Sequence, residues 1–186
     1  MHLIVDTETS GFYQALLPLD DPNQGRVIQL AALLLDEELN EVAQFSSLIY
    51  PSTWIIQPGA QKVHNISQER CDKYGIPIDI ALATLTGFFD CAEAIVAHNY
   101  RFDSQMLQNE GFQFMNRQNF CTMLATTNLC HIPSQRGGYK WPKLNEALSI
   151  LNLGVVEKAH DALADARGCA KLYKYLVQNN LLKIAA

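Results

Sequence analysis

A short apolar segment near the beginning of the chain leads directly into two acidic residues, and this feature limits the fold more than any other. Leu3-Ile4-Val5 is continuously apolar, which predicts a buried strand over residues 3–8. Asp6 and Glu8 are separated by one residue, so their side chains project from the same face of a strand. Two carboxylates held this close repel each other unless a cation lies between them.

The acidic pair has two interpretations. Oxygen ligands at the end of a buried strand favour a site for Mg²⁺ or Mn²⁺. The alternative is an ordinary strand end at which Asp6 begins a turn. A second pair with the same spacing, Asp36 and Glu38, lies in a polar turn and is interpreted as solvated surface charge. The first pair is distinguished by the buried strand that it follows at the beginning of the chain.

The rest of the pattern predicts an α/β fold class, with a mixed central β-sheet flanked by α-helices. The strands come first as a meander and then alternate with helices, which is typical of such a sheet. Further strands are expected over Val27–Leu35, Val42–Tyr50 and Ala94–Ala97, helices over Ile78–Phe89, Phe102–Glu110, 143–152 and 161–178, short helical pieces within 52–75, and loops over 10–25 and 131–142. A length of 186 residues predicts a single domain spanning 1–186.

Composition narrows the class of protein. Apolar residues make up 48% of the chain and charged residues 18%, so a sizeable core is expected and disorder is not. Apolar runs are too short to span a bilayer, and the beginning of the chain lacks the pattern of a signal peptide. Five cysteines without a CxxC pair fit free thiols in a reducing cytoplasm rather than a cysteine-based zinc cluster.

The net charge of −5 bears on partners. It disfavours a protein that coats nucleic acid by bulk electrostatics. It remains compatible with a protein that holds one chain end through a few cations and bound metal, because two divalent ions would neutralise most of the excess.

Asp165 is a further acidic candidate, on the last expected helix. It shares a stripe with Cys169, Leu172 and Leu176, which should face the body of the domain. A carboxylate there needs a partner or a metal, unless it lies at the wet end of the helix. His160 precedes Asp165 by five residues, so the two cannot share a helix face. We expect His160 in the preceding loop, leaning toward Asp165, either as a general base or as a structural histidine.

Asp103 begins the helix that follows the Ala94–Ala97 strand. It is interpreted either as a helix N-cap or as an inward-pointing acid, since Met106, Leu107 and Glu110 share its stripe. His98 and Asn99 are expected mainly to make turn and hydrogen-bonding contacts, with substrate contact as the alternative.

Three segments together resemble the exonuclease motifs of the DEDD superfamily, and in order and spacing its DnaQ-like members. They are Asp6-Thr7-Glu8-Thr9-Ser10-Gly11, Ala97-His98-Asn99-Tyr100-Arg101-Phe102-Asp103 and His160-Asp161-Ala162-Leu163-Ala164-Asp165-Ala166. A histidine with four residues before the last aspartate resembles the DEDDh branch rather than the DEDDy branch. The resemblance runs from residue 3 to about 177 and implies an RNase H-like fold.

The resemblance also implies an activity, namely 3′→5′ hydrolysis of nucleic acid from a single-stranded 3′ end, with DNA favoured and RNA open. Asp6, Glu8, Asp103 and Asp165 would hold two divalent cations, Mg²⁺ or Mn²⁺. His160 would deprotonate the attacking water. Two metals about 3.5–4 Å apart suit such an in-line displacement. A polymerase or repair partner is an expectation of the same kind, and the oligomeric state is left open.

Substrate contacts are also suggested by the resemblance. Val63-His64-Asn65-Ile66-Ser67 is similar to a family segment beside the terminal nucleotide, although Asn65 replaces the usual glycine. His64 is therefore a candidate substrate contact, and Thr7 and Thr9 are candidates to present backbone groups to the 3′ end. Cys121-Thr122 stands where many relatives have Asp-Thr, at a position that is not a metal ligand in the family.

The sequence leaves the roles of two loops undecided. Residues 12–25 form a longer loop than in many members. The segment from Arg136 to Lys143 mixes cations and aromatic residues, which either line the path of a single strand or, alternatively, leave Trp141 packed under Pro142 with solvated charges.

Two other classes of function compete with the exonuclease. One is a catalytically silent nuclease-fold module that binds nucleic acid or a polymerase. The other is a structural α/β domain with incidental acids. Neither requires the complete set of acids and histidine that the chain carries.

Overall fold

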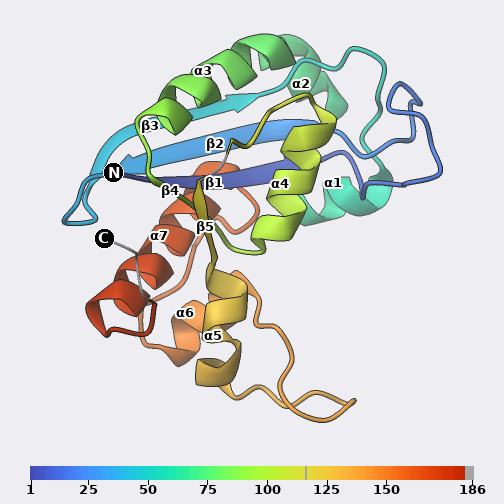
Figure 1. Cartoon of the computed structure of the whole chain (residues 1–186). Coiled ribbons are helices and arrows are strands. Elements are labelled where there is room, and N and C mark those ends of the chain that lie inside the picture. The colour runs from blue at the N-terminus through green and yellow to red at the C-terminus, as the bar shows by residue number, and fades with distance from the viewer. Residues whose placement is uncertain (116, 183–186) are drawn as a thin grey trace.

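The computed structural model describes residues 1–115 and 117–182. Within these residues a five-stranded sheet has the order β3-β2-β1-β4-β5 (Figure 1). The strands are β1 (His2–Thr9), β2 (Val27–Leu35), β3 (Glu41–Leu48), β4 (Ala94–Ala97) and β5 (Gln118–Cys121). The first three are antiparallel, whereas β4 and β5 run parallel to β1. The predicted mixed sheet is confirmed.

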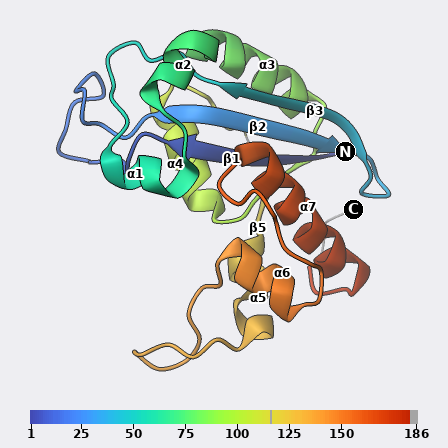
Figure 2. The same ribbon diagram turned by 180° about the vertical axis from the view of Figure 1, so that it is seen from behind.

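Helices cover both faces of this sheet (Figures 1 and 2). They are α1 (Pro58–His64), α2 (Gln68–Tyr74), α3 (Ile78–Asp90), α4 (Tyr100–Asn109), α5 (Thr122–Cys130), α6 (Leu144–Ile150) and α7 (Ala162–Gln178). One core contains Leu3 and Val5 of β1 with apolar residues of α3 and α4. A second contains Ile4 of β1 with residues of α7. Successive residues of β1 therefore face opposite helical layers, as the period of two requires.

The expected elements are present, with shifts of one or two residues at most ends. Strand β3 ends at Leu48 rather than at the expected Tyr50, and Ile49 pairs instead with Ile76. Residues 118–130 received no assignment from the sequence, yet they form β5 and α5. Strand β5 lies at the edge of the sheet and begins with two exposed polar residues, Gln118 and Asn119. It therefore has no apolar pattern by which the sequence could predict it. Helix α5 contains three threonines, which have low helix propensity, and shows no clear apolar stripe.

The topology brings the chemistry-bearing segments to one edge of the sheet. Because β1 and β4 are parallel, their carboxyl ends lie at the same edge, where the Asp6–Glu8 segment and the start of α4 meet. The N-terminal end of α7 approaches that edge from the other face (Figure 2). Among the described residues, no helix has both the length and the apolar character needed to cross a membrane.

Candidate metal and catalytic site

Strand β1 presents Asp6 and Glu8 on one face. Both are half-buried, whereas Thr7 and Thr9 between and after them are buried. This alternation confirms the expected shared face. It is also the face that packs against α7, because Ile4 belongs to the core under that helix.

Asp103 reaches the site from the opposite layer. It lies in the first turn of α4, is only 3% exposed, and is not the N-cap, a position held by Asn99 with a left-handed φ of 82°. Its Oδ1 accepts hydrogen bonds from the backbone N–H of Thr7 at 3.0 Å and from the Thr7 hydroxyl at 2.8 Å. The inward-pointing interpretation is therefore correct, and Thr7 fixes the direction of the carboxylate.

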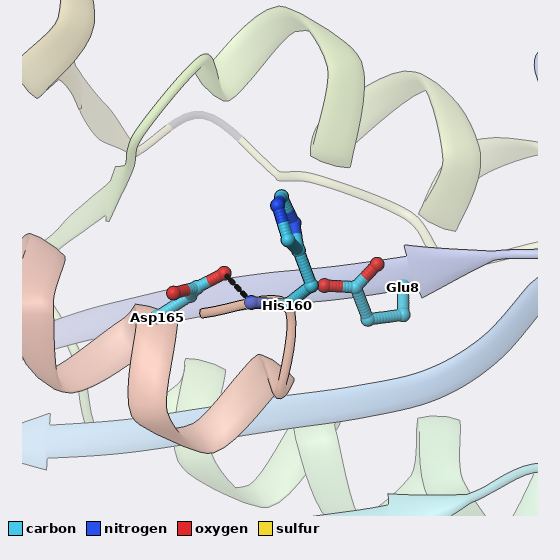
Figure 3. A group of neighbouring side chains, drawn as sticks. All are labelled: Glu8, His160 and Asp165. Atoms are coloured by element: carbon cyan, nitrogen blue, oxygen red, sulfur yellow. Dashed lines mark hydrogen bonds between the residues drawn. The ribbon is translucent and has the colours of Figure 1, made fainter. Parts of the chain in front are cut away.

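His160 lies in the turn before α7, as expected, and leans toward Asp165. Its backbone N–H donates to Asp165 Oδ2 at 2.9 Å, as Figure 3 shows. Glu8, His160 and Asp165 each offer a ligand atom within 4.8 Å of the others. His160 also has a φ of 68°, which is uncommon for a residue with a side chain. Such conformations persist where the surroundings fix them, and they concentrate at functional sites.

A buried glutamine on the neighbouring strand holds the start of α7. Gln29 Oε1 accepts from the backbone N–H of Ala162 at 3.1 Å, and its Nε2 donates to Asp161 Oδ2 at 3.2 Å. The other Asp161 oxygen caps the helix by accepting from the Ala164 N–H. The sequence analysis missed Gln29, although a polar residue within the apolar run VIQLAALLL was the available signal.

The acids and the histidine predicted as catalytic all line one pocket of about 240 Å³. Its lining includes Asp6, Glu8, Asp103, His160 and Asp165. The tight group within 4.8 Å contains three of them, Glu8, His160 and Asp165. Asp6 and Asp103 contribute to the pocket wall beside that group.

Burial and mutual repulsion raise the pKa values of these carboxyl groups. Burial raises the pKa of Asp6 well above its usual range, and Asp103 and Asp165 raise it further. Burial and then Asp165 raise the pKa of Glu8 to about 8. Burial raises the pKa of Asp103 to about 7, against the lowering effect of the Thr7 hydrogen bonds. Without a cation, these raised pKa values favour the protonated form of the carboxyl groups over the charged form.

The donor set fits hard divalent cations. Carboxylate oxygens are the ligands that Mg²⁺ and Mn²⁺ prefer, and an imidazole nearby does not exclude them. Burial also raises the pKa of the Asp165 carboxyl, against the lowering effect of His160, so removal from water disfavours its charged form as well. A bound cation would supply the opposing positive charge.

Comparison with known proteins decides the family. The model of the exonuclease family named RNase T matches residues 3–173, most of the chain. The chain belongs to this exonuclease family. Membership implies divalent metal ions as cofactors and supports nuclease activity on nucleic acid. It agrees with the resemblance to the DEDD superfamily found in the sequence.

Individual relatives of this exonuclease-family chain agree. The uncharacterized exonuclease CP81 of Escherichia phage 186 is 27% identical over 175 residues, covering 89% of this chain and 82% of that protein. E. coli Exonuclease I in complex with a dT13 oligonucleotide has a TM-score of 0.75 at 18% identity, covering 97% of this chain. Exonuclease I of Methylocaldum szegediense has a TM-score of 0.71 at 18% identity, covering 95%. These likenesses confirm the RNase H-like fold.

The solved structures are longer proteins. This chain spans 42% of the E. coli Exonuclease I chain and 40% of the Methylocaldum szegediense chain.

A second pocket adjoins the acidic one and contains the predicted substrate contacts. It has a volume of about 270 Å³, includes Thr7, Thr9 and His64, and shares Thr7, Glu8 and Phe102 with the acidic pocket. His64 Nδ1 accepts from the Ile66 N–H at 3.0 Å. Its Nε2 is buried and has no hydrogen-bond partner among residues 1–115 and 117–182. The Thr9 main chain lies close enough to raise the pKa of the His64 ring against the lowering effect of burial, so His64 forms part of the pocket wall beside Thr9.

Asn65 resolves the departure from the family pattern. It ends α1 in the left-handed region with a φ of 55°. Glycine and asparagine are the residues that favour this conformation at a helix C-terminus. The replacement of the usual glycine thus keeps the local backbone geometry beside His64.

His98 makes the hydrogen bonds expected of it. Its ring joins Thr122 Oγ1 at 3.0 Å and the Pro142 carbonyl oxygen at 3.1 Å. Because a carbonyl only accepts, Nε2 carries the proton and Nδ1 accepts from the Thr122 hydroxyl. Thr122, the residue after Cys121, therefore has a packing and hydrogen-bonding role.

Proposed function

We propose that this chain is a metal-dependent 3′→5′ exonuclease of the DEDDh branch that removes nucleotides from single-stranded nucleic acid, with DNA favoured. The carrying observation is that Asp6, Glu8, Asp103, His160 and Asp165, from three separate segments, line one pocket. E. coli Exonuclease I forms complexes with dT13 and dA16 oligonucleotides, which supports a single-stranded DNA substrate here. Residues 1–186 are taken as one domain.

The four carboxylates would hold two divalent cations, Mg²⁺ or Mn²⁺. When bound, such ions stabilise the attacking and leaving oxygens of an in-line displacement. Asp103 keeps Oδ2 free for this purpose, because Thr7 occupies Oδ1. Asp165 uses Oδ2 to accept the His160 N–H, which couples a metal ligand to the position of the histidine.

His160 is the proposed general base. Its ring is exposed at the mouth of the pocket, where an imidazole nitrogen can accept the proton of the attacking water and pass it to solvent. The hydrogen bond from its backbone to Asp165 holds the turn in place, so the ring starts from a fixed main-chain position. Thr7, Thr9 and His64 in the adjoining pocket would contact the 3′-terminal nucleotide.

The proposed activity is tested with matched DNA and RNA oligonucleotides labelled at the 5′ end. A ladder that shortens from the 3′ end, dependent on Mg²⁺ or Mn²⁺, is expected for DNA. Glu8→Gln should abolish it. Glu38→Gln, from the exposed second pair with the same Asp-x-Glu spacing, should not. Shortening from the 5′ end, or full activity of Glu8→Gln, would overturn the proposal.

The role of His160 has its own prediction. His160→Ala should reduce turnover by roughly 10²–10⁴-fold, the usual contribution of a general base. Metal binding, followed by calorimetry with Mn²⁺, should be largely kept because the carboxylates remain. Loss of Mn²⁺ binding in this variant would instead make His160 a ligand, an arrangement that its place in the tight group permits.

A further inference from the structure

The segment between α5 and α6 is an ordered projection, which we name the hairpin (residues 131–143). Figures 1 and 2 both show it extending away from the sheet. Its two arms are joined by hydrogen bonds from Lys140 N to Ile132 O at 2.9 Å and from Ser134 N to Gly138 O at 3.0 Å. Gly137 and Gly138 turn the tip with φ values of 85° and 69°, where a side chain would be strained.

The hairpin carries cations and aromatic rings in a region without acids. Residues 111–145 contain no Asp or Glu, although the chain has a net charge of −5. Arg136 and Lys143 are exposed, and neither forms an ion pair within the described part of the chain. Lys140 differs, since it pairs with Glu146 at 2.7 Å.

Trp141 decides between the two interpretations of this segment. Its side chain is not packed beneath Pro142: Trp141 is 64% exposed, whereas Pro142 is buried. Tyr139 is 45% exposed, with its ring against that of His131. An exposed tryptophan beside unpaired cations is the combination that binds unpaired bases and phosphates.

The base of the hairpin is fixed directly to the acidic pocket. Leu144, the residue after Lys143, lines that pocket. The ring of His98, another lining residue, donates to the Pro142 carbonyl oxygen at 3.1 Å. The Glu146 carboxylate accepts from the Lys143 backbone N–H at 2.8 Å. The hairpin therefore joins the wall of the acidic pocket at Leu144, one residue after Lys143 and three residues after Trp141.

We propose that the hairpin is a second contact for the substrate strand, upstream of the nucleotide being removed. Trp141 stacks on an unpaired base, and Arg136 and Lys143 contact phosphates. The inference rests on the proposed function, which puts the 3′ end in the acidic pocket. The inference predicts that affinity for long strands depends on the hairpin and that the rate of the chemical step does not.

The test compares Arg136→Ala/Trp141→Ala/Lys143→Ala with a matched triple variant on α2, Arg70→Ala/Lys73→Ala/Tyr74→Ala, whose residues are also exposed. Binding of fluorescein-labelled oligo(dT) of about 20 nucleotides, longer than most single-strand sites, is followed by anisotropy in EDTA. The hairpin variant should bind roughly 5- to 100-fold more weakly, as expected for one lost stack and two lost cations. The slope of log K against log salt should fall by about 1.4. The α2 variant should match the unaltered protein.

Kinetics separate this inference from the proposed function. For the long oligonucleotide, KM of the hairpin variant should rise while kcat stays the same, and turnover of a dinucleotide should be unaffected. If the hairpin variant binds the long strand with normal affinity and degrades it with normal KM, the hairpin inference is wrong while the exonuclease proposal stands. If the unaltered protein degrades no strand but the hairpin variant still loses binding, the exonuclease proposal fails and the hairpin contact stands. A protein that neither binds nor degrades the strand contradicts both.

Discussion

At the residue scale, Thr7 links two layers of the molecule. Asp6 and Glu8 face α7, whereas Asp103 comes from α4 on the other side of the sheet. Asp103 can join the other acids only if its carboxylate is turned across the strand edge. Two hydrogen bonds from Thr7 to one oxygen do this, at 3.0 and 2.8 Å. Thr7, which lies between the two acids, therefore has as specific a role in the site as the acids have.

Replacement of that hydroxyl gives a prediction. Thr7→Val keeps the shape but leaves Asp103 one donor short, at a cost of about 1.5–3 kcal/mol for a bond to a charged group. We expect a higher Asp103 pKa and a higher Mn²⁺ concentration for half-maximal activity. Thr7→Ser, which keeps the hydroxyl, should stay close to the original. Equal metal titration curves for both variants would show that the Thr7 backbone N–H suffices.

At the element scale, the position of α7 depends on its first turn. The early N–H groups of a helix have no partners within the helix, and here Gln29 and Asp161 satisfy them. The same contacts hold the turn that carries His160. Ala162, the first residue of the helix, is also buried in the core shared with β1 and β2.

Gln29→Leu should therefore affect catalysis more than folding. The variant removes the contacts to Ala162 and Asp161 while filling the space, so a loss of about 1–2 kcal/mol in stability is expected. Turnover should fall by a larger factor than the change in KM, because the turn carrying His160 loses its support. The measurement pairs urea unfolding with steady-state kinetics. A variant with lowered stability but unaltered kcat would contradict this positioning role.

Two glycines within helices provide a matched test of packing between elements. At Gly168 in α7, an added Cβ would lie 2.6 Å from Val156 Cγ2, whereas at Gly87 in α3 nothing lies within 4 Å. Gly168→Ala should destabilise the protein by about 1–3 kcal/mol through overpacking. Gly87→Ala should stabilise it by about 0.5–1 kcal/mol through helix propensity. The thermal unfolding temperatures of the two variants should shift in opposite directions. A shift of the same sign in both would reject the close contact at Gly168.

At the scale of the whole molecule, the acidic pocket makes stability depend on pH and on metal. The raised pKa values of Glu8, about 8, and Asp103, about 7, mean that the folded protein binds protons more tightly than the unfolded chain. Stability from these groups is present at low pH and is lost as pH rises through those values. His2, His64 and His98 have pKa values lowered mainly by burial, and their opposite effect is confined to pH below about 6.5.

Metal-free protein should therefore become less stable between pH 6.5 and 8.5. Urea unfolding in EDTA should give a free energy of unfolding that decreases across this window, and saturating Mg²⁺ should reduce the decrease by favouring the charged carboxylates. Glu8→Gln should flatten the EDTA curve. A free energy of unfolding that rises with pH in EDTA would contradict the assigned pKa directions.

Much of the site could be predicted from local pattern. The period of two placed Asp6 and Glu8 on one face of β1, and the stripe of α7 placed Asp165 above Cys169, Leu172 and Leu176, which are fully buried. The five-residue offset placed His160 in the preceding turn. These features depend on the geometry of a single element, so neighbouring residues in the chain are sufficient to specify them.

The sequence by itself thus determined which residues are the candidates for the chemistry and on which face of its own element each one lies. Only the tertiary structure decided that these faces meet, because this follows from the parallel pairing of β1 with β4 and from packing across both faces of the sheet. It also decided the contacts of Thr7 with Asp103, of Gln29 with α7 and of His98 with the hairpin. Such contacts join residues far apart in the chain, and no periodicity records them.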